Sequence, residues 1–575
     1  MITRNSTSEP NSSLIAAQPE YKSRKRFVFL TVFLLATYFT VTGLLFAATI
    51  YIDPTYTSSY QNGSISNPYN SWSKFTISSG NTYLQKAGTT FNTSSGLSVN
   101  GKSNVTLGTY GTGSKAKINA TGSGNHIINV TNSSTVIIKD LEITSTGTWI
   151  SGIIIQGNSA GNNTVNNCIV RKTEWGIRLI TTAGGNKILH STINDIKDDG
   201  IYAKDVSTIE IGFCTIYDIN KKYLVNTNQS YSAGDGIQLA STNNMNFNIH
   251  DNIIDHSSMG NKFCIIAWGN NYTGIIERNT IIASTTKNVS GIYLSPTTKT
   301  VTVRYNMIKN GKNGIYSFAK VDAYYNAFAN NLIGVYTNPN YTLNARNNVF
   351  YNNSQYGVYS TSSTNVTLRN NIFNMGSTAH KAIKTGGSIS SNNNVFNTQH
   401  SGFINNSSSL TAWRNASGND QNSLVGNPSF KNAGAHDFHL NSNSPAINRG
   451  AHVSLNKDYY GGLVPVAGNP DAGISEFNNG KAGEVIASND SIGAAKEMVL
   501  YPNPSVDGRF AVKLGKMYEK TDMEVFDMTG RLVKQVTVLM TAEGKVDMST
   551  LPDGAYLIRV DTGAEKKTLK AIKNH

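Results

Sequence analysis

The sequence WGIRLI at residues 175–180 is one copy of a short pattern that recurs through the middle of the chain. In each copy a small residue and Ile or Val are followed by residues that alternate in character, and successive copies mostly lie 20 to 28 residues apart. A fixed period of this length is typical of a solenoid, in which each coil is one structural unit. The one longer step, of 36 residues from Gly200 to Gly236, predicts an insertion near residues 220–234. The copies are SGIIIQ (151–156), WGIRLI (175–180), DGIYAK (199–204), DGIQLA (235–240), FCIIAW (263–268), SGIYLS (290–295), NGIYSF (313–318), IGVYTN (333–338) and YGVYST (356–361).

A second short motif runs in phase with the first and has Asn at eight of its ten leading positions. An amide that both donates and accepts, repeated once per coil, can form a ladder of side-chain hydrogen bonds along a stack. One coil cannot bury its apolar side chains alone, but stacked coils share one continuous core. We therefore expect an all-β fold of stacked coils. The leading positions are Asn167, Ser191, Cys214, Asn252, Asn279, Asn306, Asn326, Asn348, Asn371 and Asn394.

These motifs resemble those of the pectate-lyase-like superfamily of right-handed, single-stranded parallel β-helices, over about residues 50–475. The segments NPYNSW (67–72), GTYGTG (108–113) and NPSFKNAGAHDFHLNSNSPAINRG (427–450) are similar to the ends of secreted members. The resemblance implies a β-helix of about ten coils or more. It does not identify an enzyme, because this fold hosts lyases, hydrolases, epimerases and adhesins.

The last 75 residues lose the period and carry YPNP (501–504), GRF (508–510), VFDMTGRLVKQV (525–536) and LPDGAYLIRV (551–560). This segment resembles the C-terminal sorting domain of cargo for the type IX secretion system of the Bacteroidetes. Its alternating strands separated by Gly and Asp turns predict a small β-sandwich. The resemblance implies the type IX machinery as a partner and a secreted or outer-surface location.

Residues 22–26 (KSRKR) precede an uncharged apolar stretch of about twenty residues. This order is typical of a secretory signal peptide, although the stretch is long enough to be an uncleaved membrane anchor. The sorting domain favours cleavage, so we expect only transient membrane contact. The predicted organisation is an N-terminal extension with the signal or anchor at 1–48, a β-helix at 49–476, a linker at 477–496 and the sorting domain at 497–575.

The composition limits the classes of molecule that the protein is expected to bind. Charged residues make up only 15% of the chain, and the formal net charge is +14, which suits an anionic polysaccharide. Nucleic acid is not expected, because the β-helix region has no dense Lys/Arg run and no nucleic-acid motif. The three cysteines lie in apolar repeat segments and are expected to be packing residues. We expect the protein to be a monomer.

Candidate functional residues follow from the strand phase. If Ile and Leu of each GI-x-L-x strand point inward, the third and fifth positions face solvent and form a continuous strip on stacked coils. The early part of this strip is cationic and the later part is aromatic, which suits carboxylates and sugar rings respectively. The predicted substrate-binding residues are Tyr202, Gln238, Trp268, Tyr293 and Tyr316.

Charged residues cluster just before or within three consecutive strands of this series. In the first mechanism considered, a polysaccharide lyase acts on a uronate polymer by β-elimination. Lys204 is then the base, and Arg178 or Lys262 neutralises the uronate carboxylate. Asp199 and Asp235 are candidate ligands for Ca²⁺, a hard cation that prefers oxygen.

Two alternatives stay open. In a β-helix glycoside hydrolase, Asp199 and Asp235 are the acid and the base. Their DDGI and GDGI settings resemble those of β-helix polygalacturonases, but the Gly-His-Gly and Arg-Ile-Lys motifs of that group are absent. In a non-catalytic adhesin or glycan-binding scaffold, each Asp before Gly is only a favourable turn residue.

Overall fold

The structure is a computed structural model in which part of the chain is described. The described residues are 47–220, 234–258, 262–361, 364–376, 380–397, 400–453, 455–466, 468–478, 498–501, 505, 508–529, 531–563 and 566–573. The predicted signal or anchor and nearly all of the predicted insertion and linker lie outside these residues. Within the described ranges, every helix falls short of the length and apolarity needed to cross a bilayer.

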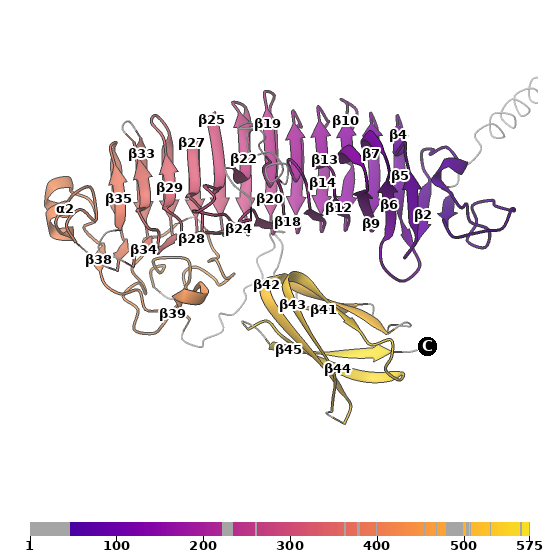
Figure 1. Cartoon of the computed structure of the whole chain (residues 1–575). Helices are drawn as coiled ribbons and strands as arrows, with labels where there is room; N and C mark the ends of the chain where they lie inside the picture. The colour runs from indigo at the N-terminus through magenta and orange to yellow at the C-terminus, as the bar shows by residue number, and fades with distance from the viewer. Residues whose placement is uncertain are drawn as a thin grey trace, which may run out of the picture. The chain divides into compact units, whose positions relative to one another are not determined.

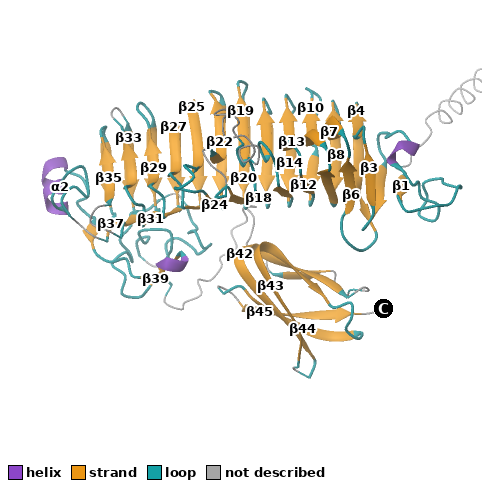
Figure 2. Ribbon diagram, in the orientation of Figure 1, coloured by secondary structure: helices purple, strands orange, loops and turns teal. Residues whose placement is uncertain are grey.

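Residues 49–425 form stacked parallel coils, and each full coil contributes one strand to each of three faces (Figures 1 and 2). The predicted parallel β-helix is therefore confirmed. The first face contains β4 (Leu97–Asn100), β7 (Ser123–Thr131), β10 (Thr148–Gln156), β13 (Trp175–Ile180), β16 (Ile201–Lys204), β19 (Ile237–Ser241), β22 (Phe263–Gly269), β25 (Ser290–Arg304), β27 (Asn313–Tyr324), β29 (Ile333–Thr337), β32 (Tyr356–Ser360) and β35 (Lys381–Thr385).

The second face continues from the first, because the long strands β25 and β27 run through both. Its other strands are β1 (Thr49–Ile52), β2 (Thr82–Lys86), β5 (Ser103–Tyr110), β8 (Ser134–Lys139), β11 (Thr164–Asn166), β14 (Asn186–Leu189), β17 (Thr208–Gly212), β20 (Met245–His250), β23 (Tyr272–Glu277), β30 (Thr342–Arg346), β33 (Asn365–Arg369) and β36 (Ile389–Asn392).

The third face is a separate 14-stranded parallel sheet of short strands. It consists of β3 (Thr90–Thr93), β6 (Ala116–Ala120), β9 (Leu141–Ser145), β12 (Ile169–Arg171), β15 (Thr192–Asn194), β18 (Thr215–Tyr217), β21 (Ile253–Asp255), β24 (Thr280–Ile282), β26 (Met307–Lys309), β28 (Ala327–Ala329), β31 (Val349–Tyr351), β34 (Ile372–Asn374), β37 (Val395–Phe396) and β38 (Leu424–Val425).

Short elements lie near the ends of the β-helix. The single-turn helix η1 (Trp72–Lys74) precedes the first complete coil, and helix α2 (Leu410–Ser417) follows the last coils. Helix α2 buries Leu410 and Trp413 in the core of the β-helix, so it covers apolar residues that no further coil would bury. The hairpin of β39 (Phe430–Asn432) and β40 (Asp437–Leu440), with helix η3 (Ala433–Ala435) between them, comes next.

The core is filled by the apolar side chains that alternate inward along the strands. Ile177 and Leu179 of β13 are fully buried, as predicted for the strand phase, whereas Arg178 between them faces outward. Later coils stack Phe328, Phe350 and Phe373 with ring centroids 5.1 and 4.8 Å apart. Cys168, Cys214 and Cys264 are buried free thiols.

The asparagine ladder is present from Asn252 to Asn394, with each Nδ2 donating to the Oδ1 of the next Asn at 2.9–3.1 Å. The prediction was wrong by one residue at its start. Cys168 pairs in register with Ser191, and Asn167 instead lies in the preceding turn with φ of +52°. An unpaired buried amide costs free energy, so continuity of the ladder favours a single register of the coils.

The C-terminal segment is a separate antiparallel sheet of five strands. They are β41 (Val499–Tyr501), β42 (Arg509–Asp527), β43 (Leu532–Asp547), β44 (Gly554–Asp561) and β45 (Lys566–Lys573). Val512, Met523, Val525, Ile558 and Val560 form its own core, so this segment folds around apolar residues distinct from those of the β-helix.

Candidate functional site

The third positions of the first-face strands form one outward row across eleven coils, which we call the outer row. Hydrogen-bonded strands lie about 4.8 Å apart, so the side chains of neighbouring coils are in contact range. Along the helix axis the row begins with Asn and Ile, passes a cation, continues through Tyr, Gln and Ile to four successive tyrosines, and ends at a second cation. Its members are Asn129, Ile154, Arg178, Tyr202, Gln238, Ile266, Tyr293, Tyr316, Tyr336, Tyr359 and Lys384.

Arg178 is the most constrained cation of this row. Its guanidinium carbon lies 4.4 Å from the ring centroid of Trp175 and 5.8 Å from that of Tyr202. The Nε atom is buried and has no hydrogen-bond partner. Burial is the main influence on the Arg178 guanidinium and lowers its pKa, while Tyr202 and Asp199 act in the opposite direction. A planar guanidinium held between rings with an unused donor is suited to a carboxylate ligand.

Three residues around Arg178 were not predicted from the sequence as part of the site. His126, Ser151 and Trp175 occupy equivalent positions on successive coils, before the outer row. His126 Nδ1 and Ser151 Oγ are buried without hydrogen-bond partners, as is Arg178 Nε. Burial, with a smaller contribution from Arg178, lowers the pKa of His126, so its imidazole is neutral at neutral pH. The sequence signal was weak, because HIIN at 126–129 lacks the glycine that marks the other copies.

Asp199 and Asp235 lie at the starts of neighbouring first-face coils and are each only 2% exposed. Oδ1 of Asp199 accepts a hydrogen bond from the Asp235 amide at 2.8 Å, and Oδ1 of Asp235 accepts one from the Phe263 amide at 2.9 Å. Burial raises the pKa of Asp235 to about 7, and burial with repulsion from Asp235 raises the pKa of Asp199 well above its ordinary value. Both carboxyls therefore cap backbone amides between coils.

The two lysines of the predicted site lie on different sides of the outer row. Lys204 is exposed at the end of β16 and is in register with Ile180 and Ala240. Lys262 precedes β22, and its charge lowers the pKa of the buried Asp235. Neither lysine forms an ion pair with a residue that the structure describes. A lysine acts as a base most readily when it is desolvated, and Lys204 is exposed on its own coil.

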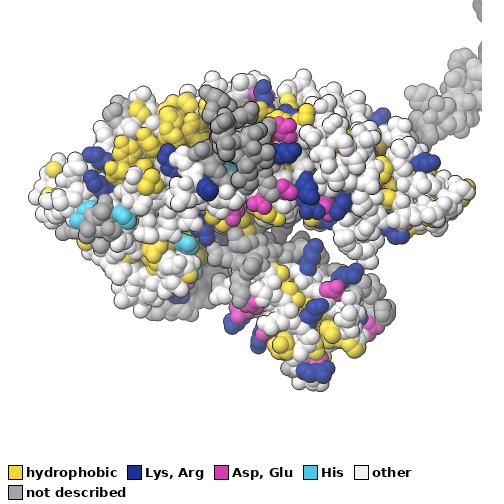
Figure 3. All heavy atoms as spheres, viewed as in Figure 1, with side chains coloured by type: hydrophobic (Ala, Val, Ile, Leu, Met, Phe, Trp, Pro, Cys, Tyr) yellow, Lys and Arg dark blue, Asp and Glu magenta, His cyan; other side chains and the backbone are white. Residues whose placement is uncertain are grey.

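Beyond Gln238, which is half-buried beside Tyr202, the first face becomes mainly aromatic, and Trp268 lies two residues after the row position of its strand. Trp268 is 55% exposed, and its ring is stacked 6.2 Å from that of Tyr293. Tyr293 and Tyr316 follow with ring centroids 5.4 Å apart. The space-filling view shows a continuous hydrophobic patch over this part of the first face, with basic side chains on both sides (Figure 3). The structure therefore brings the predicted substrate-binding residues together on one surface.

The second face has an outward row of a different kind, which we call the ion-pair ladder. Lys187 pairs with Glu210 at 2.6 Å, and Glu210 contacts His250 at 3.2 Å. Charges of opposite sign continue to alternate across the next coils, and each forms a pair within the ladder. The remaining pairs are His250–Asp251 (2.8 Å), Asp251–Arg278 (2.9 Å), Arg278–Glu277 (2.6 Å) and Glu277–Arg304 (2.6 Å).

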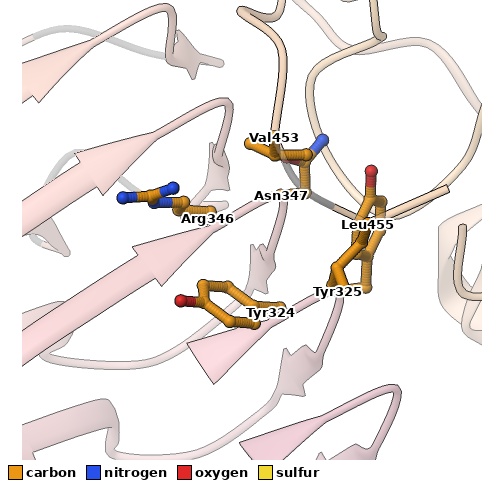
Figure 4. A pocket seen from close by; sticks show the side chains of 6 residues that line it. All are labelled: Tyr324, Tyr325, Arg346, Asn347, Val453 and Leu455. Atoms are coloured by element: carbon orange, nitrogen blue, oxygen red, sulfur yellow. The ribbon is translucent and has the colours of Figure 1, made fainter. Parts of the chain in front are cut away.

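Two hollows lie away from the predicted residues. One cavity, of about 60 Å³, is lined by side chains of β27 and β30 and by a later loop (Figure 4). Such a volume is too small for a sugar, since ligand pockets usually measure about 300 Å³ or more. A shallower hollow of about 370 Å³ lies over the second face beside Lys187 and Glu210. Both of these residues are already paired within the ion-pair ladder.

The predicted Ca²⁺ site would use the carboxylates of Asp199 and Asp235. Asp199 and Asp235 are buried, each already accepts an amide hydrogen bond, and their raised pKa values favour the protonated form. Calcium requires several charged or carbonyl oxygens that face the ion. Among the described residues there is also no group of three or more His, Cys, Asp or Glu side chains that could hold a metal. These two residues do not fit the ion.

Comparisons with known proteins match two parts of the chain. Residues 175–331 match the family described as right handed beta helix region, and residues 499–574 match the secretion system C-terminal sorting domain. No curated protein is similar enough in sequence to count as a relative.

Several solved structures share the coiled architecture at low identity. A mannuronan C-5 epimerase module of Azotobacter vinelandii is 14% identical, with 60% of this chain and 91% of that chain covered and a TM-score of 0.36. A lacto-N-biosidase of Eubacterium ramulus is 10% identical, with coverages of 63% and 68% and a TM-score of 0.32. An alginate lyase of a Paenibacillus species is 11% identical, with coverages of 62% and 99% and a TM-score of 0.23. Likeness at this level assigns no activity.

The stacked parallel strands and the two family matches agree with one another. The C-terminal match is a sorting signal for type IX secretion, which places the protein outside the cell or at its surface. The chain is therefore a right-handed parallel β-helix protein that carries a type IX secretion sorting domain and is secreted or displayed at the cell surface.

Proposed function

We propose that the protein is a carbohydrate-active enzyme of the cell exterior that cleaves an anionic, uronate-containing polysaccharide by β-elimination. The observation that carries this proposal is Arg178, a half-buried guanidinium with an unpartnered Nε between two aromatic rings. Buried donors without partners are costly, so a site that keeps one is suited to a ligand that supplies the acceptor. A uronate carboxylate supplies it with the matching charge.

In this proposal Arg178 neutralises the uronate carboxylate and so acidifies the proton on the neighbouring C5 carbon. A base removes that proton, the electron pair forms the C4–C5 double bond, and the C4–O bond to the leaving sugar breaks. Burial raises the pKa of Tyr202, so its phenol stays protonated and can donate a proton to the departing oxygen. The aromatic run from Trp268 to Tyr316 binds the sugar faces on the same surface.

Two residues are candidates for the base. Lys204 lies one coil beyond Arg178 and requires the bound polymer to exclude water from its ammonium group. His126 lies on the other side of Arg178, and its lowered pKa keeps it neutral and able to accept a proton. We retain Lys204 as the base and propose His126 as the alternative. The pH dependence of turnover separates them, because a His126 base stays active until the pH falls through its lowered pKa, whereas a lysine base becomes protonated at a higher pH.

An Asp-pair hydrolase receives less support from the geometry. Inverting hydrolases hold two accessible carboxyls about 6.5–9.5 Å apart, with room for a water between them. Asp199 and Asp235 are both buried and are linked through the backbone amide of Asp235. A non-catalytic glycan-binding protein remains the second candidate, because the aromatic run alone would serve it.

The test is incubation of the full chain with a panel of uronate and neutral polysaccharides. Ultraviolet absorbance of an unsaturated product, lost in Arg178→Gln and retained in Arg278→Gln, supports the lyase. New reducing ends without that absorbance support a hydrolase. Binding without any product supports the scaffold and overturns the proposed reaction.

A further inference from the structure

The aromatic run continues for two coils beyond the residues assigned to the proposed reaction. Tyr336 is stacked 4.9 Å from Tyr316, and Tyr359 lies 4.9 Å from Tyr336 in an edge-to-face arrangement. Tyr356 adds a further ring 5.0 Å from Tyr359. These tyrosines are half-buried, so each ring rests on its neighbour and also meets solvent.

The core does not require these rings. The same coils already stack Phe328, Phe350 and Phe373 inside the β-helix. On the second face of these coils, one outward row is polar and contains no ring: it consists of Thr302, Asp322, Asn344, Thr367 and Ser390. The other outward row contains a single ring and consists of Arg304, Tyr324, Arg346, Arg369 and Asn392. A continuous run of neighbouring rings is therefore a feature of the first face and not of the repeat itself.

Two lysines follow the last tyrosines in register. Lys384 pairs with Tyr359 on the neighbouring strand, and Lys381 pairs with Tyr356. Neither lysine forms an ion pair with any residue within the described ranges. The outer row thus ends at Lys384, a cation next to aromatic rings, and Arg178 earlier in the row has similar neighbours.

We propose that Tyr336, Tyr359, Lys381 and Lys384 form a distal subsite for the polymer that reacts at Arg178. The tyrosines stack against sugar rings, and the lysines bind a carboxylate several residues along the same chain. Arg178 and Lys384 are separated by eight coil steps, or about 38 Å at about 4.8 Å per step. This inference rests on the proposed function and adds that the substrate is a long polyanion lying along the helix axis.

A distal subsite predicts that affinity increases with ligand length. A short uronate oligomer reaches only the residues near Arg178, whereas a long one also reaches the tyrosines and the lysines. The gain is a multivalent effect of linked contacts on one ligand. It requires no change at the reacting centre.

The experiment measures binding of short and long uronate oligomers to the full chain by calorimetry. The double variant Tyr336→Ala, Tyr359→Ala should bind long oligomers about tenfold more weakly and short ones unchanged. Lys384→Gln, a surface change that should leave folding intact, should weaken long oligomers about two- to fivefold. Matched controls are Tyr217→Ala, an exposed tyrosine of the third face, and Lys74→Gln, an exposed lysine before the first coil.

Each outcome has a distinct meaning. If long oligomers lose no affinity in either variant although the wild type binds them, the distal subsite is wrong and the proposed function stands. If the wild type binds no uronate of any length, both proposals fail. If the double variant instead abolishes self-association of the chain, the tyrosine row is a contact between two copies, and the subsite is also wrong.

Discussion

The first and second faces of this β-helix are built on the same coils, but they differ in how their charged side chains are neutralised. In the ion-pair ladder of the second face, cations and anions alternate and each is paired, as in the contact of Arg278 with Asp251 and Glu277. On the first face, Arg178 lies between rings with an unused donor, and no carboxylate of the outer row neutralises it. The repeat accounts for the strands, and on the first face the unused donor of Arg178 leaves binding capacity for another molecule.

This difference separates structural charge from functional charge. Charges that are satisfied within the chain contribute modest stability and hold neighbouring coils together. Arg178 is partly desolvated, and its buried Nε lacks a hydrogen-bond partner, which costs stability. A functional role explains why such a residue is kept.

Removal of the unpartnered cation should have the largest effect. Arg178→Gln is expected to lower kcat/KM for a uronate polymer about 100-fold, because it removes the group that stabilises charge at the substrate carboxylate. Thermal stability should be unchanged or slightly raised. Steady-state kinetics and a thermal melt of the same sample provide the check. Equal loss of kcat/KM in Arg304→Gln, on the ion-pair ladder, would contradict the distinction between the faces.

Adding a carboxylate should make the first face behave like the second. Gln238→Glu places an anion beside Tyr202, and the Tyr202 ring lies against Arg178. We expect about tenfold weaker binding of uronate through repulsion of the ligand and partial neutralisation of the cation. Gln238→Ala is the matched control, because it removes the same hydrogen-bonding group without adding charge. Similar losses in the two variants would mean that the amide, and not the local charge, matters.

The pH dependence of stability should have opposite signs on the two faces. Burial raises the pKa of Asp235 to about 7 from an unfolded value of 3.8, so the folded state binds more protons in this range. Its contribution is full below the unfolded pKa and is lost as the pH rises from about 4 to about 7. Asp251 of the ion-pair ladder has a lowered pKa, because His250 and Arg278 outweigh its desolvation. Its stabilisation is present above its unfolded pKa and is lost as the pH falls through the lowered value.

The variant Asp235→Asn tests the first of these two signs. Its amide oxygen can still accept the Phe263 hydrogen bond, so the loss of stability between about pH 4 and about pH 7 should become smaller than in wild type. Thermal unfolding across that range measures it. An unchanged difference between acid and neutral melting temperatures would show that the Asp235 carboxyl does not titrate in this window.

The smallest effect is expected on the ion-pair ladder itself. Arg278 is 44% exposed on its side chain, so Arg278→Gln should lower the free energy of unfolding by about 1 kcal/mol or less. The loss should shrink in high salt, because screening weakens the wild-type pair. Denaturant unfolding at low and high salt provides the measurement. A loss that is independent of salt would point to packing of the side chain and not to its charge.

Much of the architecture could be predicted from the sequence because the repeat encodes it locally. The spacing of WGIRLI and its copies predicted parallel coils, the inward Ile177 and the outward Arg178, and the structure confirms each of these. The ladder start was misplaced by one residue, since NCI at 167–169 contains both an Asn and a Cys at adjacent positions. Only the register of neighbouring coils decides which of the two stacks.

The candidate site was predictable only in part. Tyr202, Gln238, Tyr293 and Tyr316 could be read from strand phase, because outward positions repeat with the coil. The surroundings of Arg178 could not, because Trp175 precedes the repeat glycine and His126 lies in a coil without it. The burial of Asp199 could not be predicted from the sequence either. Asp before Gly predicts an exposed turn, yet the stacking of coils encloses Asp199 and directs its carboxylate to the next amide.

The most direct test of the central claim compares the two arginines in one binding experiment. Calorimetric titration of a uronate oligomer into wild type, Arg178→Gln and Arg278→Gln uses the same chain and the same charge change on different faces. Our account predicts that binding is lost or weakened about 100-fold in Arg178→Gln and is retained in Arg278→Gln. Equal affinity of all three proteins for the oligomer would contradict the assignment of the first face as the binding surface.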